Sequence, residues 1–443
     1  MEIYIPEIIR WSSLDQAEKN EAIRRPPLPD LNISSSVADI IGQVRDHGDA
    51  ALIRFGQQFD GADLDQLEVS AEEFLSAESA VEPDLLQAID EAISRIENFH
   101  RAGMPKPLSK ETAPGLVCEA RYLPISPVGL YVPGGSAPLI STVLMLALPA
   151  RIAACEDVIL CSPPDSEGRI APAILVAAAR CGVKRIFKVG GAQAIAAMGL
   201  GTATIPACAK LFGPGNAWVT EAKQQISILP DGAARDMPAG PSEVLVVADD
   251  GADATAVCWD LLSQAEHGPD SQAIVISDSQ ELLAEVTAIL PTLAAGLPRV
   301  AILSESLRHM RQILVSSMQE AVTISNSYAP EHLILNCRGA EELAASVTAA
   351  GSVFIGPWTP ESLGDYCSGT NHVLPTYGYA RAYSGLSVSD FLRRMTLQRA
   401  GFEGLKNVGA CAMTLAAAEG LDAHRMAVDY RLSQGNEQGD RRA

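Results

Sequence analysis

Gln264 and His267, two side chains able to hold a metal ion, stand three residues apart near the end of a predicted helix. The helix covers about residues 253–269 and ends at Gly268-Pro269. Its apolar residues recur at helical spacing (Val257, Leu261, Leu262 and Ala265). The i,i+3 spacing places both polar side chains on one face. Such a pair is more often simply solvated at a helix end than part of a metal site. The other polar stretches of the chain must decide between these two interpretations.

Glu331 and His332 form the next candidate pair. They follow residues 321–326, which we predict as a strand, and an acid beside an imidazole at a strand end can act as a general-base pair. Adjacent side chains need not point the same way, so the two could serve separate proton transfers. For this pair alone, a capping glutamate beside a core histidine is the plainer alternative.

Segment 356–376 is rich in Gly, Ser, Thr and Pro, and it also contains Asp365 and His372. We predict a long loop on a rigid scaffold, where ionisable residues are more often functional than decorative. Cys367 lies between them but has neither the helix start nor the basic neighbour that activates a thiol, so we treat it as incidental.

Glu419 and His424 lie in the last segment, 380–443, which we predict to contain no strands. Such a tail packs poorly by itself, and it would be explained if it reached onto a second subunit and completed a site there. Two imidazoles and two oxygen ligands could then meet in one place. That set suits zinc, and equally Mn, Co or Fe. The four side chains are Gln264, His267, Asp365 and His424.

Three glycine-containing turns could approach a phosphate, since each precedes a predicted helix start. They are YVPGGSAPL (131–139), VGGAQA (189–194) and FGPGNAW (212–218). None is the dinucleotide fingerprint, because Trp218 stands where a third glycine belongs. Taken alone, the turns are about as well explained as ordinary strand-to-helix connections.

Composition excludes several classes of partner. The 443 residues contain 33 basic and 54 acidic side chains, a formal charge of −21, which repels nucleic acid and anionic membranes. Nine cysteines without a C-x-x-C pair favour reduced thiols over disulfides. The N-terminus has no signal-peptide pattern, and no apolar run is long enough to span a bilayer. We therefore expect a soluble, cytoplasmic protein.

The elements around these residues change character along the chain. Residues 1–128 read as mainly helical. From residue 129 buried strands alternate with helices, which predicts an α/β fold with parallel sheets, divided into units at 129–235 and 236–379. Because ligands of such sheets bind at the carboxyl ends of the strands, we expect the site at those ends.

A series of motifs resembles the histidinol dehydrogenase family across essentially the whole chain. In order they are GLYVPGGSAPL, VGGAQAIAA, FGPGNAWVTEAK, DMPAGPSEVLV, DLLSQAEHGPDSQ, YAPEHL, AGSVFIG, ESLGDYCSGTNHVLPTYG and LAAAEGLDAH. The resemblance implies two incomplete, doubly wound Rossmann-like domains in an aldehyde-dehydrogenase-like arrangement. It also implies a helical N-terminal region packed with the second domain and an extended C-terminal tail exchanged within a homodimer.

The same resemblance assigns roles residue by residue. Glu331 and His332 would be the catalytic pair. One zinc ion per subunit would be held by Gln264, His267 and Asp365, with His424 supplied by the partner. Substrate contacts would come from the zinc ligands, from His332, and from Ser242, His372 and Glu419. Of these, Glu419 would be supplied by the partner, like His424. NAD would be bound at Tyr131, Gln193 and Asn216.

The implied reaction oxidises L-histidinol to L-histidine through bound L-histidinaldehyde, with two NAD reduced (EC 1.1.1.23). The chain departs from the family pattern on the cofactor side, at Pro127, where arginine is usual, and at Ala203 and Ala209, where acids are usual. Three alternatives remain. They are a related zinc- and NAD-dependent enzyme for another polar alcohol such as a sulfonated diol, a non-catalytic ligand-binding α/β protein, and an aldehyde dehydrogenase with a cysteine nucleophile.

Overall fold

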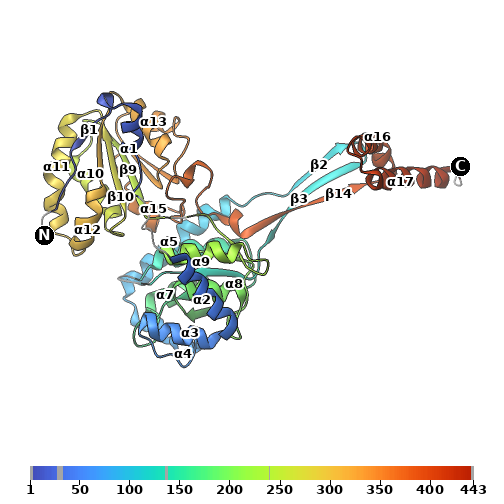
Figure 1. Cartoon of the computed structure of the whole chain (residues 1–443), viewed down its shortest axis with the longest axis horizontal. Coiled ribbons are helices and arrows are strands. Elements are labelled where there is room, and N and C mark those ends of the chain that lie inside the picture. Colours follow the sequence, from blue (N-terminus) through green and yellow to red (C-terminus); the bar gives the residue numbers. More distant parts are fainter. Residues whose placement is uncertain (1–2, 27–32, 135–137, 239, 441–443) are drawn as a thin grey trace. The chain divides into compact units, whose positions relative to one another are not determined.

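The computed structural model describes residues 3–26, 33–134, 138–238 and 240–440. Contacts divide the chain into two units (Figure 1). Unit 1 consists of Met1–Gly103 and Ile125–Phe391, and unit 2 consists of Met104–Pro124 and Leu392–Ala443. The predicted borders at residues 128, 235 and 379 stay a prediction. Residues 135–137 of the first predicted phosphate turn lie outside the described residues.

Unit 1 contains a five-stranded parallel sheet with the order β6-β5-β4-β7-β8. Its strands are β4 (Val128–Tyr131), β5 (Val158–Ser162), β6 (Arg185–Lys188), β7 (Lys210–Phe212) and β8 (Ala234–Arg235). The helices between them are α6 (Ile140–Ile152), α7 (Pro172–Arg180), α8 (Gly191–Leu200) and α9 (Ala217–Ser227). Strand β4 is buried along its whole length, as expected for a parallel strand covered on both faces.

Unit 1 also contains a six-stranded parallel sheet with the order β1-β11-β10-β9-β12-β13. Its strands are β1 (Ile8–Arg10), β9 (Glu243–Ala248), β10 (Gln272–Ser277), β11 (Arg311–Leu314), β12 (His332–Asn336) and β13 (Ser352–Ile355). The helices are α10 (Ala254–Ala265), α11 (Gln280–Ala295), α12 (Val300–Ser306), α13 (Met318–Tyr328), α14 (Ala340–Ala344) and α15 (Glu361–Tyr366).

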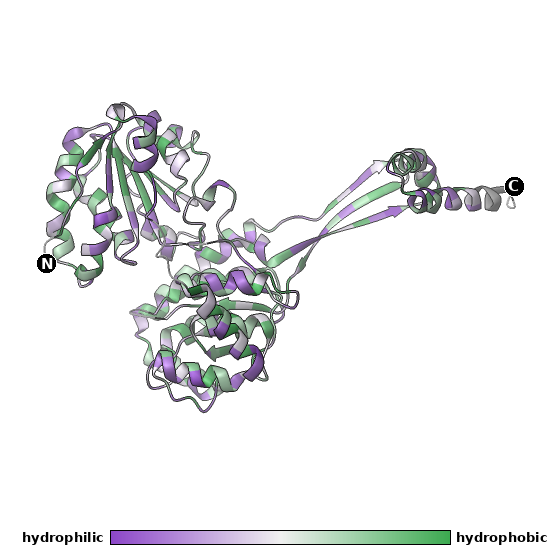
Figure 2. Ribbon diagram, in the orientation of Figure 1, coloured by the Kyte–Doolittle hydropathy of each residue, from purple (hydrophilic) through white to green (hydrophobic). Residues whose placement is uncertain are grey.

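Both sheets are doubly wound. In the first sheet β4 lies in the middle, with β5 and β6 on one side and β7 and β8 on the other. In the second sheet β9 takes this place, with β10 and β11 on one side and β12 and β13 on the other, and β1 is added at the edge beside β11. This is the Rossmann order, and the predicted α/β class is confirmed. Strand β9 shows why both faces are covered: Val244 and Val246 pack into one apolar core, and Leu245 and Val247 into another. Figure 2 shows the resulting apolar strands in both sheets.

The N-terminal residues are mostly helical, as predicted, with three exceptions. Strand β1 joins the second sheet, and strands β2 (Leu108–Ala113) and β3 (Leu116–Pro124) belong to unit 2. The helices are α1 (Gln16–Ala22), α2 (Ile33–His47), α3 (Asp49–Phe55), α4 (Ala71–Ala77) and α5 (Pro83–Ala102). Helix α2 packs its apolar face into the core of the first sheet, beside α8 and α9.

The predicted strand at residues 321–326 is wrong, because these residues lie inside helix α13. Ser317 caps the helix by accepting a hydrogen bond from the backbone of Glu320. The buried residues that follow recur at helical spacing (Ala321, Val322, Ile324, Ser325 and Tyr328). The cap and this spacing outweigh the strand preference of the β-branched residues.

Unit 2 is an antiparallel sheet in the order β14-β3-β2, followed by helices α16 (Phe402–Ala418) and α17 (Asp422–Asp440). Strand β14 (Leu392–Ala400) contradicts the prediction of a strand-free tail. Most of its side chains are exposed, so it lacks the alternation of apolar and polar residues that identifies a strand in sequence. Across the described residues, no helix is long and apolar enough to cross a membrane.

Position 213, directly after β7, can be occupied only by glycine without strain. Its φ is +126°, and an added β-carbon would lie 2.1 Å from the carbonyl oxygen of Tyr131. Gly213→Ala is therefore expected to lower the free energy of unfolding by roughly 2–5 kcal/mol, from strain and overpacking together. Gly42→Ala is the control, because Gly42 lies inside α2 and an added β-carbon there would have no atom within 4 Å. This change should raise the free energy of unfolding by about 0.5–1 kcal/mol. Equal denaturation midpoints for the two variants would contradict this account.

Candidate active site

The chemistry-bearing residues of the second sheet gather at the amino ends of its strands. Glu243 is the first residue of β9 and His332 is the first residue of β12, and these two strands are paired. Gln264 lies in the last turn of α10, which precedes β10 and so ends at the same edge. Two predictions are corrected here: this cluster is not at the carboxyl ends, and Glu331 and His332 enter a strand rather than follow one.

His332 is held on both sides of its ring. On one side, Nδ1 lies 2.7 Å from Gln264 Nε2 and 3.1 Å from the backbone oxygen of Glu243. Gln264 Nε2 also donates to that backbone oxygen, at 3.3 Å. On the other side, His332 Nε2 lies 3.4 Å from Asp365 Oδ1, in a buried position where it makes no well-formed hydrogen bond. The imidazole is therefore fixed while Nε2 keeps its capacity for a further partner.

Glu331 is buried beside this imidazole. Its Oε2 accepts a hydrogen bond from the backbone N–H of Glu243 at 2.9 Å and lies 3.7 Å from His332 Nδ1. Burial raises the pKa of Glu331 to about 8. Burial lowers the pKa of His332, but the facing carboxyls of Glu331, Glu361 and Asp365 outweigh it and raise that pKa to about 10. Both groups therefore favour their protonated forms at neutral pH, and each must release a proton before it can act as a base.

Asp365 and His372 come from the segment predicted as a long loop, whose first part is instead helix α15. His372 Nδ1 lies 2.8 Å from the backbone oxygen of Asp365, and its Nε2 lies 3.4 Å from Thr142 Oγ1 on α6. Burial lowers the pKa of His372, which favours the neutral imidazole. Burial would raise the pKa of Asp365, but His332, His372 and His267 lower it, so the carboxylate is ionised.

Two predicted metal ligands of unit 1, His267 and Asp365, are close enough to influence each other's pKa. His267 lies just beyond the end of α10. Its pKa is lowered by burial and, to a smaller extent, by the nearby basic groups of His332, His372 and Arg299, while Asp365 opposes the shift. The His267 residue is exposed to solvent, so its imidazole is only partly desolvated. A neutral imidazole, an ionised carboxylate and an amide form a nitrogen–oxygen set that fits zinc.

No group of three His, Cys, Asp or Glu in the described residues is arranged to hold a metal. The predicted set has only two such residues in unit 1, together with the amide of Gln264. Its fourth member, His424, lies in α17 of unit 2, and Glu419 lies at the end of α16 in the same unit. Ser242 directly precedes β9, where its backbone oxygen accepts a hydrogen bond from Gln272 at 2.9 Å.

Sequence reasoning missed several residues that support the cluster. Glu243 contacts Glu331 and His332 only through its backbone, which no side-chain motif can reveal. Glu361 is fully buried four residues before Asp365, and burial raises its pKa to about 8. The sequence did contain a signal for Glu361, because it lies one helical turn before the predicted ligand Asp365. Thr142 and Arg25 are distant in sequence from the residues they contact, and no pattern pointed to either one.

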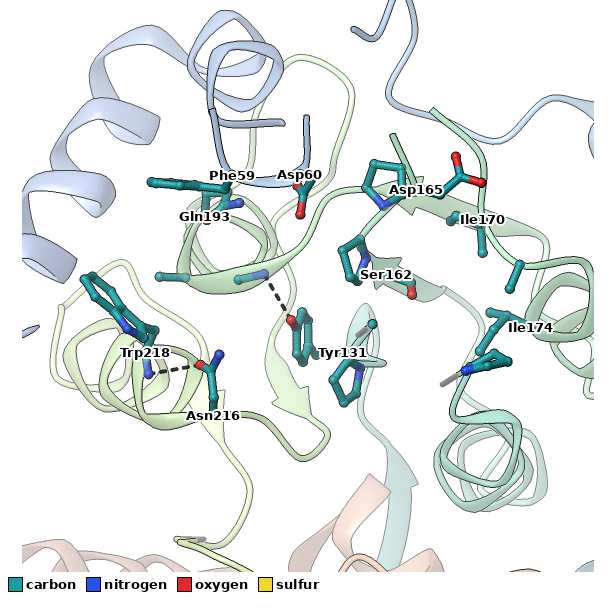
Figure 3. A pocket seen from close by; sticks show the side chains of 18 of the residues that line it. Phe59, Asp60, Tyr131, Ser162, Asp165, Ile170, Ile174, Gln193, Asn216 and Trp218 are labelled. Carbon is teal, nitrogen blue, oxygen red and sulfur yellow. Dashed lines mark hydrogen bonds between the residues drawn. The ribbon is translucent and has the colours of Figure 1, made fainter. Parts of the chain in front are cut away.

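The three predicted cofactor residues meet at one cavity of about 760 Å³ beside the first sheet. Figure 3 shows Tyr131, Gln193 and Asn216 around it, with Trp218 and Asp60 also on the wall. Unlike the histidine cluster, this cavity lies at the carboxyl ends of its strands, since β4 ends at Tyr131 and β7 ends four residues before Asn216. Strand order reverses between these two strands, the place where nucleotides bind in such sheets.

Local hydrogen bonds shape the cavity wall. The hydroxyl of Tyr131 accepts a hydrogen bond from the backbone N–H of Gly191 at 3.0 Å, and burial raises the pKa of Tyr131 to about 12. Asn216 caps α9 by accepting hydrogen bonds from Trp218 and Val219 at 3.1 and 3.2 Å. The cap orients the amide, and its N–H groups make no hydrogen bond within the described residues, so they can bind a ligand.

Comparison with known proteins gives a consistent result. A family model described as histidinol dehydrogenase matches residues 24–432. A histidinol dehydrogenase from Xanthomonas axonopodis pv. citri (strain 306) is 55% identical over 427 residues, which cover 96% of this chain and 99% of the relative. One from Xylella fastidiosa (strain Temecula1 / ATCC 700964) is 53% identical, with the same coverage.

The same family is found among solved structures. The crystal structure of histidinol dehydrogenase from Elizabethkingia anophelis matches with a TM-score of 0.94 and 43% identity, covering 98% of this chain and 100% of that one. Together with the two Rossmann-ordered sheets, these similarities define an NAD-dependent dehydrogenase. More particularly, the chain belongs to the histidinol dehydrogenase family, whose reaction serves histidine biosynthesis.

A buried acid on α10, Asp260, makes the stability of the fold depend on pH. Burial raises the pKa of Asp260 from 3.8 to about 7. A raised folded-state pKa means that stability is complete below about pH 4, falls as the pH rises, and levels off above about pH 7. Asp260→Asn cannot ionise, so its stability relative to the natural chain should grow across that window, by up to about 4 kcal/mol.

Thermal unfolding at pH 4 and pH 8 measures this difference. Asp39→Asn, on the exposed face of α2, is the control. The same difference between Asp260→Asn and the natural chain at both pH values would contradict the prediction.

Proposed function

We propose that the chain oxidises L-histidinol to L-histidine in two steps, through a bound aldehyde, with one NAD reduced in each step. The observation that carries this proposal is the imidazole of His332 held between Glu331 and Asp365. The NAD cavity of the first sheet supports it, and so does family membership.

In the first step, His332 would accept the hydroxyl proton as hydride leaves the alcohol carbon for NAD. In the second step, Glu331 would take a proton from water as the water oxygen adds to the aldehyde, and His332 would return its proton to the former carbonyl oxygen. The resulting hydrate would then transfer its hydride to a second NAD while His332 again accepts the hydroxyl proton. Because burial raises the pKa of Glu331 to about 8, the share of ionised carboxylate that can take this proton grows as the pH rises toward 8. His372, fixed between Asp365 and Thr142, would hold the substrate through both steps.

We propose that Gln264, His267 and Asp365 hold zinc. Gln264 Nε2 is engaged by Glu243 and His332, which orients the amide and leaves Oε1 for a metal. When bound, zinc would anchor the substrate's amine and imidazole, and its charge would oppose the carboxyls that keep a proton on His332.

His424 and Glu419 would come from the second subunit of a homodimer. Their position in unit 2, a unit separate from the one that carries the other ligands, supports an exchange of this kind. Tyr131, Gln193 and Asn216 would bind NAD, and Ser242 would contact the substrate at the amino edge of β9.

The NADH formed per L-histidinol consumed tests the proposal directly. Dialysed protein is assayed with and without added zinc, and we expect two NADH per substrate, with turnover restored by zinc. One NADH with release of free aldehyde would remove the second step. No NADH from L-histidinol, with turnover of another polar alcohol, would reject the substrate assignment.

Glu331→Gln tests the division of labour between the catalytic pair. The amide keeps an acceptor for the backbone N–H of Glu243 but cannot take a proton from water, so oxidation of the aldehyde should fall by about 10²–10⁴-fold. Oxidation of the alcohol should fall much less. Single-turnover measurements started from L-histidinol and from L-histidinaldehyde separate the two steps, and equal losses in both would exclude separate roles.

A further inference from the structure

Arg25 forms a buried ion pair that no part of the proposed chemistry uses. Its Nη2 donates to Glu243 Oε2 at 2.8 Å, and its Nε donates to Oε1 of the same carboxylate. The arginine side chain is 11% exposed and the glutamate side chain 1% exposed. The guanidinium carbon lies 3.8 Å from the ring centroid of Tyr328. A two-point contact of this kind fixes the position of its acid as well as its charge.

The same pair also holds two strained backbone positions. Ala329 and Tyr377 have positive φ angles, 56° and 57°, which are costly for residues other than glycine. Arg25 Nη2 donates to the backbone oxygen of Ala329 at 3.3 Å, and the backbone N–H of Tyr377 donates to Glu243 Oε1 at 3.1 Å. Ala329 lies two residues before Glu331, so its conformation sets the direction in which the chain enters the catalytic pair.

The backbone of Glu243, in turn, holds the chemistry. Its N–H donates to the carboxylate of Glu331, and its carbonyl oxygen lies within hydrogen-bond distance of His332 Nδ1 and Gln264 Nε2. The side chain and the backbone of one residue thus connect Arg25 to three groups of the site.

We propose that Arg25 is a positioning residue for the catalytic pair. It acts through Glu243: the ion pair holds residue 243 at the amino end of β9, and residue 243 orients Glu331, His332 and Gln264. Its effect on turnover rests on the proposed function, whereas its effect on the backbone does not.

The test compares three variants with the natural chain. Arg25→Met removes the ion pair, and Arg25→Lys keeps the charge without the two-point contact. Arg151→Met is the control, because Arg151 forms another partly buried ion pair in unit 1, with Glu97, and contacts none of the site residues in any hydrogen bond of the described chain. Each variant is assayed for NADH production from L-histidinol, for thermal stability, and for hydrogen exchange in segments 241–246 and 329–334.

Arg25→Met is expected to lower kcat by about 100-fold, the usual cost of misplacing a reacting group by an ångström, with KM within about threefold. Arg25→Lys should recover only part of this loss. Exchange should rise in the two segments for Arg25→Met and not for Arg151→Met. Equal kcat losses in Arg25→Met and Arg151→Met, or unchanged exchange in both segments, would overturn the proposal. If the natural chain did not oxidise L-histidinol, the proposed function would fail while hydrogen exchange would still decide the role of Arg25.

Discussion

Burial of both faces of each parallel sheet is the constraint from which the rest of unit 1 follows. Val244 to Val247 alternate between two apolar cores, so no polar side chain can leave the middle of β9 without entering one of them. In β9 the polar residue is therefore confined to the end of the strand, at Glu243. The cavity lined by Tyr131 and the cluster around His332 also lie at strand ends.

The two sheets share one strand order but use opposite ends. The first sheet offers its carboxyl edge, where strand order reverses and helix starts present N–H groups. At the corresponding edge of the second sheet, Asp249 accepts hydrogen bonds from the backbone and guanidinium of Arg338 at 3.1 and 2.8 Å. The amino edge carries backbone carbonyls and acids instead, which suit a cation and a proton-accepting imidazole.

Sequence could predict those parts of the site that are local. The helix around Gln264 was found because Val257, Leu261 and Ala265 repeat along it, and all three are buried. Glu331 and His332 are adjacent, so their pairing was visible even though the strand beside them was misplaced. Partners that meet only after folding carry no local signal: Arg25 and Glu243 are 218 residues apart.

The strand at 392–400 was missed for a related reason. Its residues are exposed, so what makes it a strand is pairing with β3 rather than burial of its own side chains. The position of the His332 cluster at the amino ends of the second sheet could not be predicted either. The fold-level rule for such sheets places ligands at the carboxyl ends of strands and says nothing of residues at the amino ends.

Unit 2 is made from two segments that lie far apart in the chain, and this affects its biosynthesis. A ribosome completes β3 roughly 270 residues before it completes the start of β14, a delay on the order of 15–50 s at ordinary elongation rates. During that time the hairpin of β2 and β3 has an unpaired edge, which can recruit another nascent chain. The sheet closes only when the C-terminal segment leaves the exit tunnel. Truncated translation products therefore contain this open edge, and clearing them is a task for chaperones and proteases.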